Sequence, residues 1–269
     1  MEGCKKGFVS VIIGLFDVAP FLAEKRLECV LNQTWKDLEI ILVNDGSTDE
    51  TLRLCKELAS EDSRIVLIDK PNGGLGSARN AGLDAASGEY VWFYDVDDVA
   101  ELDLVETNMR WMKEYDTDMI IFGNEFIYPE TGRVETTRFK ERLLESNDAL
   151  KRIFMDEILL VPNGNGFVWN KFYRKDFIER CGARFGEQHI QQDELFNLNC
   201  ILRYRGYSFL LKYSTTTTSI AVETTGPDLF LTGLRFMNPY LMGYVNSRIN
   251  GIWRTYDWKA TLINAFIRG

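Results

Sequence analysis

The first half of the chain alternates between two patterns of apolar positions. The first pattern is a short, nearly continuous apolar run rich in Val and Ile, which is typical of a strand buried on both faces of a sheet. Strands of this kind are predicted over Val9–Phe16, Leu38–Val43, Arg64–Ile68, Tyr90–Tyr94 and Asp118–Phe122.

The second pattern is a helical spacing of apolar residues between these runs. It predicts a helix around Leu27–Leu31, one after the capping box Ser47–Glu50, and two more over Ser77–Ala86 and Glu101–Tyr115. Strand and helix alternating at this spacing imply right-handed crossovers. The pattern therefore predicts an α/β fold with a mostly parallel central sheet flanked by helices.

The second half is less regular. It contains a predicted hairpin over residues 126–137, a strand over Trp169–Tyr173, a helix Lys175–Cys181 that ends at Gly182, and a helix Gln192–Arg205. The segment 156–192 is irregular, and we expect specificity for a ligand to lie there, because such loops vary most between related proteins.

Several polar residues follow directly after predicted strands. In open parallel sheets ligands bind outside the carboxyl ends of the strands. We therefore expect one polar edge to collect Asp17, Asn44, Asp45, Asp95, Asp97 and Asp98.

The amino-acid composition argues against several classes of protein. The chain has 269 residues, 45% hydrophobic and 26% charged, with a net charge of −9. This balance predicts a globular core and excludes a basic surface for nucleic acid. Five cysteines without a C-x-x-C pair, and a single histidine, His189, argue against structural zinc or a disulfide framework and favour a reducing cytoplasm.

Residues 5–16 resemble a short signal peptide, because two lysines precede an apolar run. The run is too short and ends at Asp17, so we interpret it as the first strand. We find no uncharged apolar run of about 18 residues or more, and therefore predict no membrane-spanning helix.

Asp95-Val96-Asp97-Asp98 is the first candidate site. Extended geometry would point Asp95 and Asp97 to the same side, and hard oxygens at that spacing suit Mg²⁺ or Mn²⁺ bridging to a diphosphate. The alternative is that Asp97 or Asp98 caps the helix that begins near Glu101.

Two loops form the next candidates. Asp45 stands at a strand end before a glycine turn and could accept the ring N–H of a pyrimidine base; the alternative is a simple turn with a capping box. Gly74-x-Gly76 leads toward Arg79 and could face phosphates at a helix start, or be only a flexible connection. It is not a dinucleotide fingerprint, because Arg79 replaces the third glycine.

Asp193 and Lys171 are the last candidates. Asp193 near a helix start could act as a general base toward a hydroxyl, or simply cap that helix. Lys171 could balance the charge of a diphosphate, or be a solvated lysine at a strand end.

Four blocks of the chain together resemble family 2 glycosyltransferases with the GT-A fold. The resemblance is dense over residues 8–98, looser through about 210, and fits the bacterial enzymes that build capsule, exopolysaccharide or lipopolysaccharide sugars. The blocks are Val9–Ile13, Asn32–Asp49, Gly73–Asn80 and Gly88–Asp98.

The resemblance implies a role for each matching residue. Asp193 resembles the catalytic base, and Asp97, with Asp95, resembles the ligands of Mn²⁺ or Mg²⁺. The implied residues that bind the donor, a nucleotide-diphosphate sugar that is usually UDP-linked, are Gly14, Phe16, Asp17, Asp45, Arg79, Asp95, Val96 and Lys171. Members of this family commonly invert the anomeric centre in one displacement.

The chain departs from the family pattern at four positions. The family usually has Pro at the position of Gly14, Asn at Asp17 and Asp at Asn44, and often Glu at Gln192. A nucleotidyltransferase and a non-catalytic subunit that binds a sugar nucleotide or a glycan are the competing interpretations. The first would carry a glycine-rich basic loop after the first strand, and residues 14–20 have no basic residue and one glycine.

The domain prediction is a GT-A catalytic domain over residues 1–226, with a donor half of about 8–123 and an acceptor half of about 124–226. Residues 227–269 are predicted to form a helical C-terminal extension, which carries a net charge of +3 and eight aromatic residues.

This extension suits peripheral contact with an anionic membrane, where a lipid-linked glycan acceptor would lie. The alternatives are packing on the catalytic domain or on a second copy in a homodimer. We expect a cytoplasmic protein, or one that is peripheral at the inner face of the cell membrane.

Overall fold

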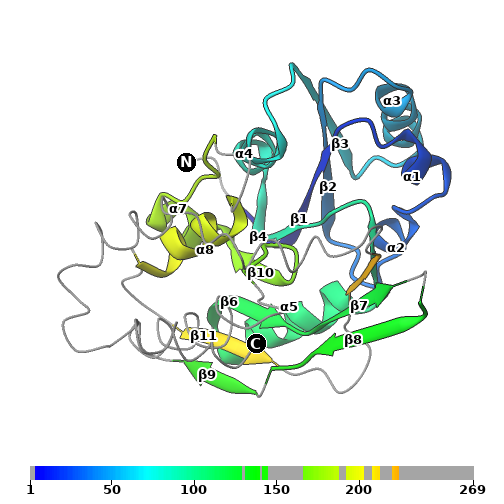
Figure 1. Ribbon diagram of the computed structural model, residues 1–269. Coiled ribbons are helices and arrows are strands. Elements are labelled where there is room, and N and C mark those ends of the chain that lie inside the picture. The colour runs from blue at the N-terminus through cyan, green and yellow to red at the C-terminus, as the bar shows by residue number, and fades with distance from the viewer. Residues whose placement is uncertain are drawn as a thin grey trace.

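The computed structural model describes residues 4–128, 131–139, 141–144, 166–187, 192–202, 208–212 and 220–223. Residues 156–165 and 188–191 of the irregular segment, His189 among them, and the predicted extension 227–269 lie outside this part of the chain. The described elements form two sheets with helices on both sides of the larger one (Figure 1).

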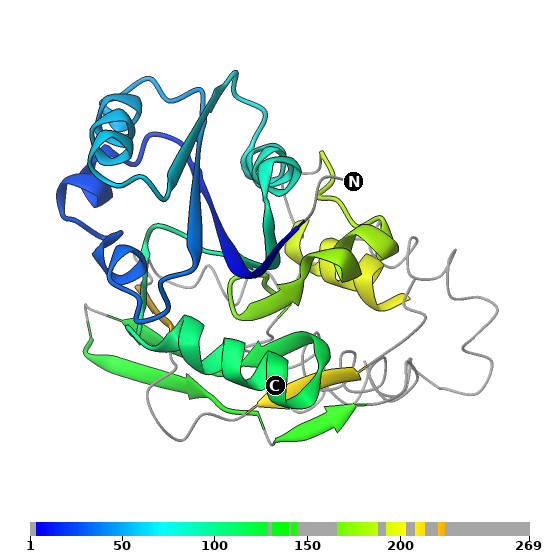
Figure 2. The same cartoon turned by 180° about the vertical axis from the view of Figure 1, so that it is seen from behind.

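The larger sheet has eight strands in the order β3-β2-β1-β4-β10-β6-β11-β9, and it runs from β3 at one end of the molecule to β9 at the other (Figure 1 and, from behind, Figure 2). Strands β3, β2, β1 and β4 are all parallel, as is the pair β6–β11. Only β10 and β9 run against their neighbours. The prediction of a mostly parallel α/β sheet is therefore confirmed. The strands are β1 (Lys5–Leu15), β2 (Leu38–Asp45), β3 (Ile65–Lys70), β4 (Gly88–Phe93), β6 (Thr117–Phe122), β9 (Arg142–Leu144), β10 (Lys171–Arg174) and β11 (Ser208–Lys212).

The smaller sheet has four strands in the order β5-β12-β7-β8. Strands β7 (Asn124–Tyr128) and β8 (Arg133–Thr137) pair antiparallel, which confirms the predicted hairpin. Strands β5 (Asp98–Ala100) and β12 (Ile220–Glu223) join segments that are far apart in sequence.

Alternate residues of β1 face two separate cores, as expected for a strand in the middle of a three-layer fold. Val9, Val11 and Ile13 pack with residues of α2 and α5, whereas Ile12 packs with residues of α4, α7 and α8. The helices are α1 (Ala19–Ala23), α2 (Glu28–Leu31), α3 (Thr51–Glu61), α4 (Leu75–Ala85), α5 (Leu104–Tyr115), α7 (Lys175–Cys181) and α8 (Gln192–Leu202). None of the helices in the described ranges is long and apolar enough to cross a membrane.

Helix α7 ends as predicted, because Gly182 takes the left-handed conformation that favours glycine. The capping-box prediction at residues 47–50 is wrong. Glu50 precedes α3 without any side-chain cap, and the Ser47 hydroxyl instead accepts a hydrogen bond from the amide of Asp17. The interpretation of Asp97 or Asp98 as a helix cap is also wrong, because β5 intervenes and α5 begins only at Leu104.

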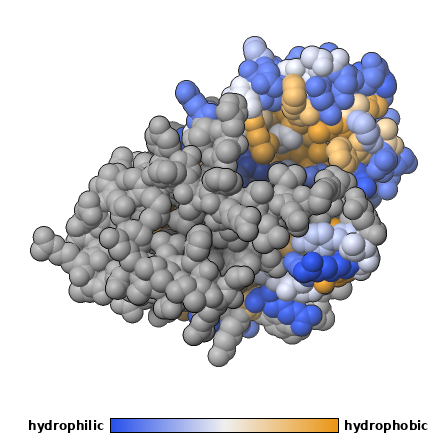
Figure 3. Space-filling model, viewed as in Figure 1, coloured by the Kyte–Doolittle hydropathy of each residue, from blue (hydrophilic) through white to orange (hydrophobic). Residues whose placement is uncertain are grey.

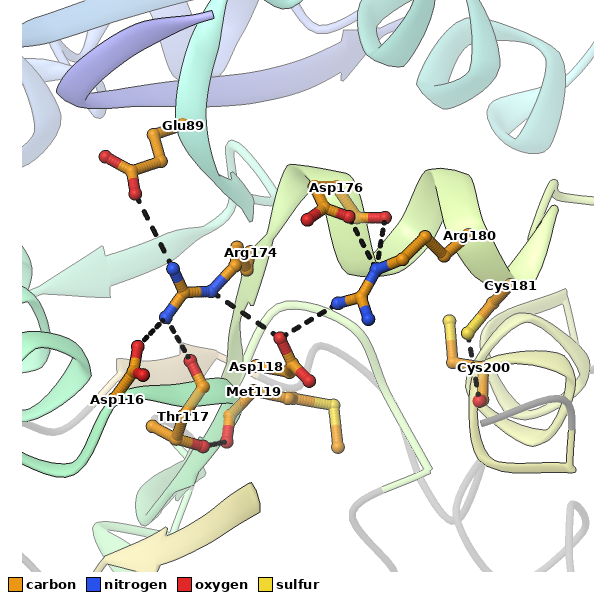
Figure 4. Close-up of polar contacts among 10 residues, drawn as sticks. All are labelled: Glu89, Asp116, Thr117, Asp118, Met119, Arg174, Asp176, Arg180, Cys181 and Cys200. Carbon is orange, nitrogen blue, oxygen red and sulfur yellow. Dashed lines mark hydrogen bonds and ion pairs between the residues drawn. The ribbon is translucent and has the colours of Figure 1, made fainter. Parts of the chain in front are cut away.

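Strand β10 enters the sheet antiparallel between β4 and β6. Its carboxyl end therefore lies at the amino ends of β4 and β6, where Arg174 is 3.6 Å from Glu89, 2.7 Å from Asp116 and 3.5 Å from Asp118 (Figure 4). Arg180 of α7 also pairs with Asp118, at 3.1 Å. This ionic network fastens β10 at the edge opposite the predicted site. The amino end of β10, which carries Lys171, consequently lies at the same edge as the carboxyl end of β4.

Candidate active site

The carboxyl ends of β1, β2 and β4 meet where the strand order reverses. The chain passes from β1 outward to β2 and β3, and then returns to place β4 on the other side of β1. Such a reversal leaves a crevice beyond the strand ends, which is the common ligand site of open α/β sheets. The predicted polar edge is therefore formed here.

Arg79 of α4 joins two carboxylates that are far apart in sequence. Its Nη1 lies 2.5 Å from Asp193 Oδ1, and its Nη2 lies 2.8 Å from Asp95 Oδ1. The guanidinium also lies 5.4 Å from the ring centre of Phe185, and only 3% of the Arg79 side chain is exposed. Burial lowers the pKa of Arg79, but the charges of Asp193 and then Asp95 outweigh it and raise the pKa overall. The positively charged Arg79 side chain thus binds both Asp193, the predicted base, and Asp95, a predicted metal ligand.

The acidic run after β4 folds as a turn and not as an extended segment. The amide of Asp98 donates to the carbonyl of Asp95 at 3.0 Å, Val96 is buried, and Asp97 is exposed. The expected extended geometry is therefore wrong for this run, while the joint role of Asp95 and Asp97 as metal ligands stays a prediction. The turn forms because β5 starts at Asp98 and pairs with β12 in the other sheet.

The acidic run carries more negative charge than its one ion pair, between Asp95 and Arg79, neutralises. Desolvation and then the charge of Asp95 raise the pKa of Asp97. Burial, followed by the charges of Asp95 and Asp97, raises the pKa of Asp98 well above its usual range, and Asp98 Oδ2 is buried without a hydrogen-bond partner. Uncompensated hard oxygens of this kind fit Mg²⁺ or Mn²⁺. Within the described ranges no group of three or more acidic, His or Cys side chains forms a metal site.

Asp45 holds the glycine loop that precedes α4. Its carboxylate accepts hydrogen bonds from the amides of Gly73 and Gly74, at 3.1 and 2.7 Å, and pairs with Lys70 Nζ at 2.5 Å. The neighbouring Gly46 has a φ of +70°, and a side chain there would lie 2.6 Å from the backbone nitrogen of Asn72. The structure thus gives Asp45 a clear role in shaping the loop, and its contact with a nucleotide base stays a prediction.

Asn44 has a structural reason to differ from the family pattern. Its Nδ2 donates to Asp69 Oδ1 at 2.7 Å, while its Oδ1 is buried without a hydrogen-bond partner. An aspartate here would face another carboxylate and bury an unpaired charge.

We therefore expect Asn44→Asp to lower the free energy of unfolding by about 1–3 kcal/mol at pH 7. Urea unfolding measures this change. Restoring one donor with the double variant Asn44→Asp/Asp69→Asn should recover part of the loss. Equal stability of the single variant and the wild-type chain would contradict the pairing.

The loop after β1 is tied to the loop after β2. Asp17, with a φ of 50°, accepts hydrogen bonds from the amides of Thr48 at 2.7 Å and Asp49 at 3.3 Å. Gly14 allows α4 to pack closely on β1, because a Cβ there would lie 2.9 Å from Leu75 Cδ1. Phe16 is 50% exposed at the end of β1. Their roles toward a donor remain predictions.

Lys171 is buried, so its interpretation as a solvated lysine at a strand end is wrong. Its Nζ donates to Asn170 Oδ1 at 2.8 Å and to the carbonyl of Phe167. Burial lowers the pKa of Lys171 to about 7, against the charges of Asp193 and Glu194. The cause of the burial is the position of β10 between two other strands.

Two groups around Asp193, the Val168 amide and Phe185, have no signal in the sequence, and a third, Gln192, is the position at which the family often has Glu. The amide of Val168 donates to Asp193 Oδ2 at 3.0 Å, and Phe185 packs on the partner of Asp193, Arg79. Gln192 lies against the first turn of α4, where a Cβ on Gly76 would be 2.9 Å from Gln192 Oε1. A backbone amide and long-range packing leave no local pattern, so only the tertiary structure reveals them.

Comparison with known proteins assigns the class. A family model described as glycosyl transferase family 2 matches residues 10–182, which is more than half of the chain. The chain therefore belongs to glycosyltransferase family 2, and the resemblance predicted from sequence is confirmed.

Individual relatives agree with this class. Glycosyltransferase GlyA of Streptococcus pneumoniae serotype 4 is 42% identical over 198 residues, which cover 70% of this chain and 27% of GlyA. The uncharacterized glycosyltransferase EpsJ of Bacillus subtilis is 34% identical over 195 residues, which cover 71% of this chain and 55% of EpsJ. The chain thus spans only about half of EpsJ, and less of GlyA.

Among solved structures, a crystal structure of S. aureus TarS 1-349 in complex with UDP-GlcNAc matches with a TM-score of 0.70 and 20% identity. The match covers 90% of this chain and 66% of that one. This likeness supports the predicted GT-A fold.

Proposed function

We propose that this chain is an inverting, metal-dependent glycosyltransferase. It moves a sugar from a nucleotide-diphosphate sugar, with UDP as the expected nucleotide, to a hydroxyl of a glycan or lipid-linked glycan in the synthesis of a cell-surface polysaccharide. The observation that carries the proposal is Arg79, which holds Asp95 and Asp193 on one guanidinium at the carboxyl edge of the sheet.

The donor half of the site would bind the nucleotide. The half-exposed ring of Phe16 offers an apolar surface one residue beyond Leu15, which pairs with Asn44, the neighbour of Asp45. Figure 3 shows apolar side chains gathered on this face over β1–β3 and α4, inside a rim of polar ones. A rim of this kind around an apolar surface suits a ligand with one aromatic part and one charged part. The TarS complex with UDP-GlcNAc supports this choice of donor class.

Each residue of the site has a separate role in the proposed reaction. Asp193 takes the proton from the acceptor hydroxyl, whose oxygen forms a bond to the anomeric carbon while the bond to the diphosphate breaks on the opposite face. Arg79 and the Val168 amide hold the two oxygens of Asp193 in one orientation. Asp97 and Asp95 would hold Mg²⁺ or Mn²⁺, which when bound matches the charge of the diphosphate leaving group.

A panel of sugar nucleotides tests the proposal and separates its competitors. The wild-type chain is incubated with UDP-linked and other donors, Mn²⁺, and an acceptor extract from polysaccharide-producing bacteria. We expect transfer or slow hydrolysis of one donor, with release of nucleoside diphosphate. Release of pyrophosphate from a nucleoside triphosphate would favour a nucleotidyltransferase. Tight UDP binding without any turnover would favour a non-catalytic subunit.

The extension 227–269 is proposed to contact a membrane, its own core or a second copy. Co-sedimentation with anionic liposomes, compared between the full chain and one ending at Thr225, distinguishes the first alternative from the others.

A further inference from the structure

The backbone segment that contacts Asp193 is held by buried side chains. The segment 166–170 connects to β10, and its Val168 amide donates to Asp193 Oδ2 at 3.0 Å. Asn197 Nδ2 donates to the carbonyl of Gly166 at 2.5 Å and to that of Phe167 at 3.2 Å. The Tyr173 hydroxyl donates to Asn197 Oδ1 at 2.6 Å and fixes the orientation of that amide. The position of the Val168 amide thus depends on interior groups, not on contacts at the surface.

Lys171 completes this arrangement from the other side. Its Nζ donates to the Phe167 carbonyl, which belongs to the same peptide unit as the Val168 amide. It also donates to Asn170 Oδ1 at 2.8 Å, and the side chain is completely buried. A peptide unit is planar, so holding its carbonyl oxygen fixes the direction in which its N–H points. Lys171 therefore sets the direction of the hydrogen bond that Asp193 Oδ2 receives.

We propose that Lys171 is a positioning residue for the general base: it fixes the Phe167–Val168 peptide so that its N–H holds Asp193 Oδ2. The inference rests on the proposed function, since it assigns a task to Lys171 in the same reaction. It differs from a direct role of Lys171 at the diphosphate, because the Nζ atom lies in the interior and donates to the segment 166–170.

The expected consequence follows from the geometry of Asp193. One oxygen is held by Arg79 and the other by the Val168 amide, so the plane of the carboxylate is defined by two contacts. Losing the second contact frees the carboxylate to rotate about the first. A misplacement of about 1 Å in a catalytic group can cost roughly 10²-fold in rate. The effect should fall on the chemical step and leave donor binding in place.

The test compares Lys171→Met with Lys171 intact, and uses Lys175→Met as the matched control. Methionine keeps the length of the side chain and removes the amine, whereas Lys175 at the start of α7 pairs with Glu179 at 3.0 Å outside the site. We expect Lys171→Met to lower kcat for transfer by about 10–100-fold. The donor KM and the Kd for UDP should stay within about twofold. The control should match the wild-type chain in all three values.

Thermal unfolding separates positioning from a structural role. Removing the buried amine relieves its desolvation cost but leaves Asn170 Oδ1 and the Phe167 carbonyl without this donor, so we expect a modest fall in the melting temperature of Lys171→Met and compare kcat well below it. A lower melting temperature with unchanged kcat would overturn the proposal. A raised donor KM or UDP Kd with unchanged kcat would overturn it in favour of a diphosphate contact.

A second variant carries the test if Lys171→Met fails to fold. Asn197→Ser removes the other donor to the Phe167 carbonyl, and it should lower kcat with the same unchanged donor KM. Unchanged kcat in this folded variant would contradict the role of the segment. If the wild-type chain transfers no sugar from any donor, the proposed function fails first and the positioning role fails with it.

Discussion

Asp193→Asn is expected to reduce the rate of sugar transfer by roughly 10²–10⁴, the usual cost of losing general-base catalysis. The amide is nearly the same size as the carboxylate but cannot take up the proton of the acceptor hydroxyl. It also presents an N–H₂ group to either Arg79 or the Val168 amide, both of which are donors. Arg79 keeps its pair with Asp95, so the buried cation is not left alone. Single-turnover transfer assays and calorimetric binding of UDP measure the two parts of this expectation.

The matched control is Asp84→Asn, because Asp84 is an exposed carboxylate that pairs with Arg184 at 3.2 Å away from the site. It should transfer sugar at the wild-type rate. UDP binding by Asp193→Asn should equal that of the wild-type chain. If UDP binding weakens as much as transfer slows, Asp193 is a donor contact or a structural residue and not the base.

Asp97→Ala is expected to remove almost all metal-dependent transfer while the fold stays nearly intact. Asp97 is exposed, and its removal relieves repulsion within the acidic run, where desolvation and then the charge of Asp95 raise the pKa of Asp97. The cost falls on the reaction, because the charge of the leaving diphosphate is then unmatched. Transfer assays over a range of Mn²⁺ concentrations, together with Mn²⁺ binding followed by electron paramagnetic resonance, measure the effect.

Asp103→Ala provides the comparison, since Asp103 is another aspartate of the same connection and precedes α5 without a side-chain cap. It should bind Mn²⁺ and transfer sugar as the wild-type chain does. Full activity of the wild-type chain in EDTA, or of Asp97→Ala with Mn²⁺, would show that the reaction does not use a metal at this position.

The parallel sheet and the helices between its strands are predictable from sequence, because they depend on patterns of neighbouring residues. Apolar runs such as Leu38–Val43 can be buried on both faces only inside a covered parallel sheet, and their spacing leaves room for one helix between strands. Because Asp45 and Asp95 follow parallel strands, their positions alone predict that both lie at the carboxyl edge of the sheet, where ligands bind. The hairpin at residues 126–137 and the helix end at Gly182 were predictable in the same way, because both depend on neighbouring residues.

Short segments were predicted less well, because competing long-range contacts decide them. The residues Ser47–Glu50 form a capping box by pattern, yet Ser47 is used by the amide of Asp17 from another loop. The run Asp95–Asp98 reads as extended by itself, but pairing of β5 with β12 folds it into a turn. In both places a partner distant in sequence outcompetes the local preference.

The α/β class, the family and the edge at which the site lies follow from the amino-acid sequence, because all three depend on periodicity and on motifs of adjacent residues. Which side chains meet depends on how the distant segments pack. Arg79 joins Asp95 to Asp193 because α4 and α8 pack on the same face of the sheet. Lys171 is interior because β10 enters antiparallel between β4 and β6. Arg79 and Asp193 are 114 positions apart, and no pattern along the chain records their contact.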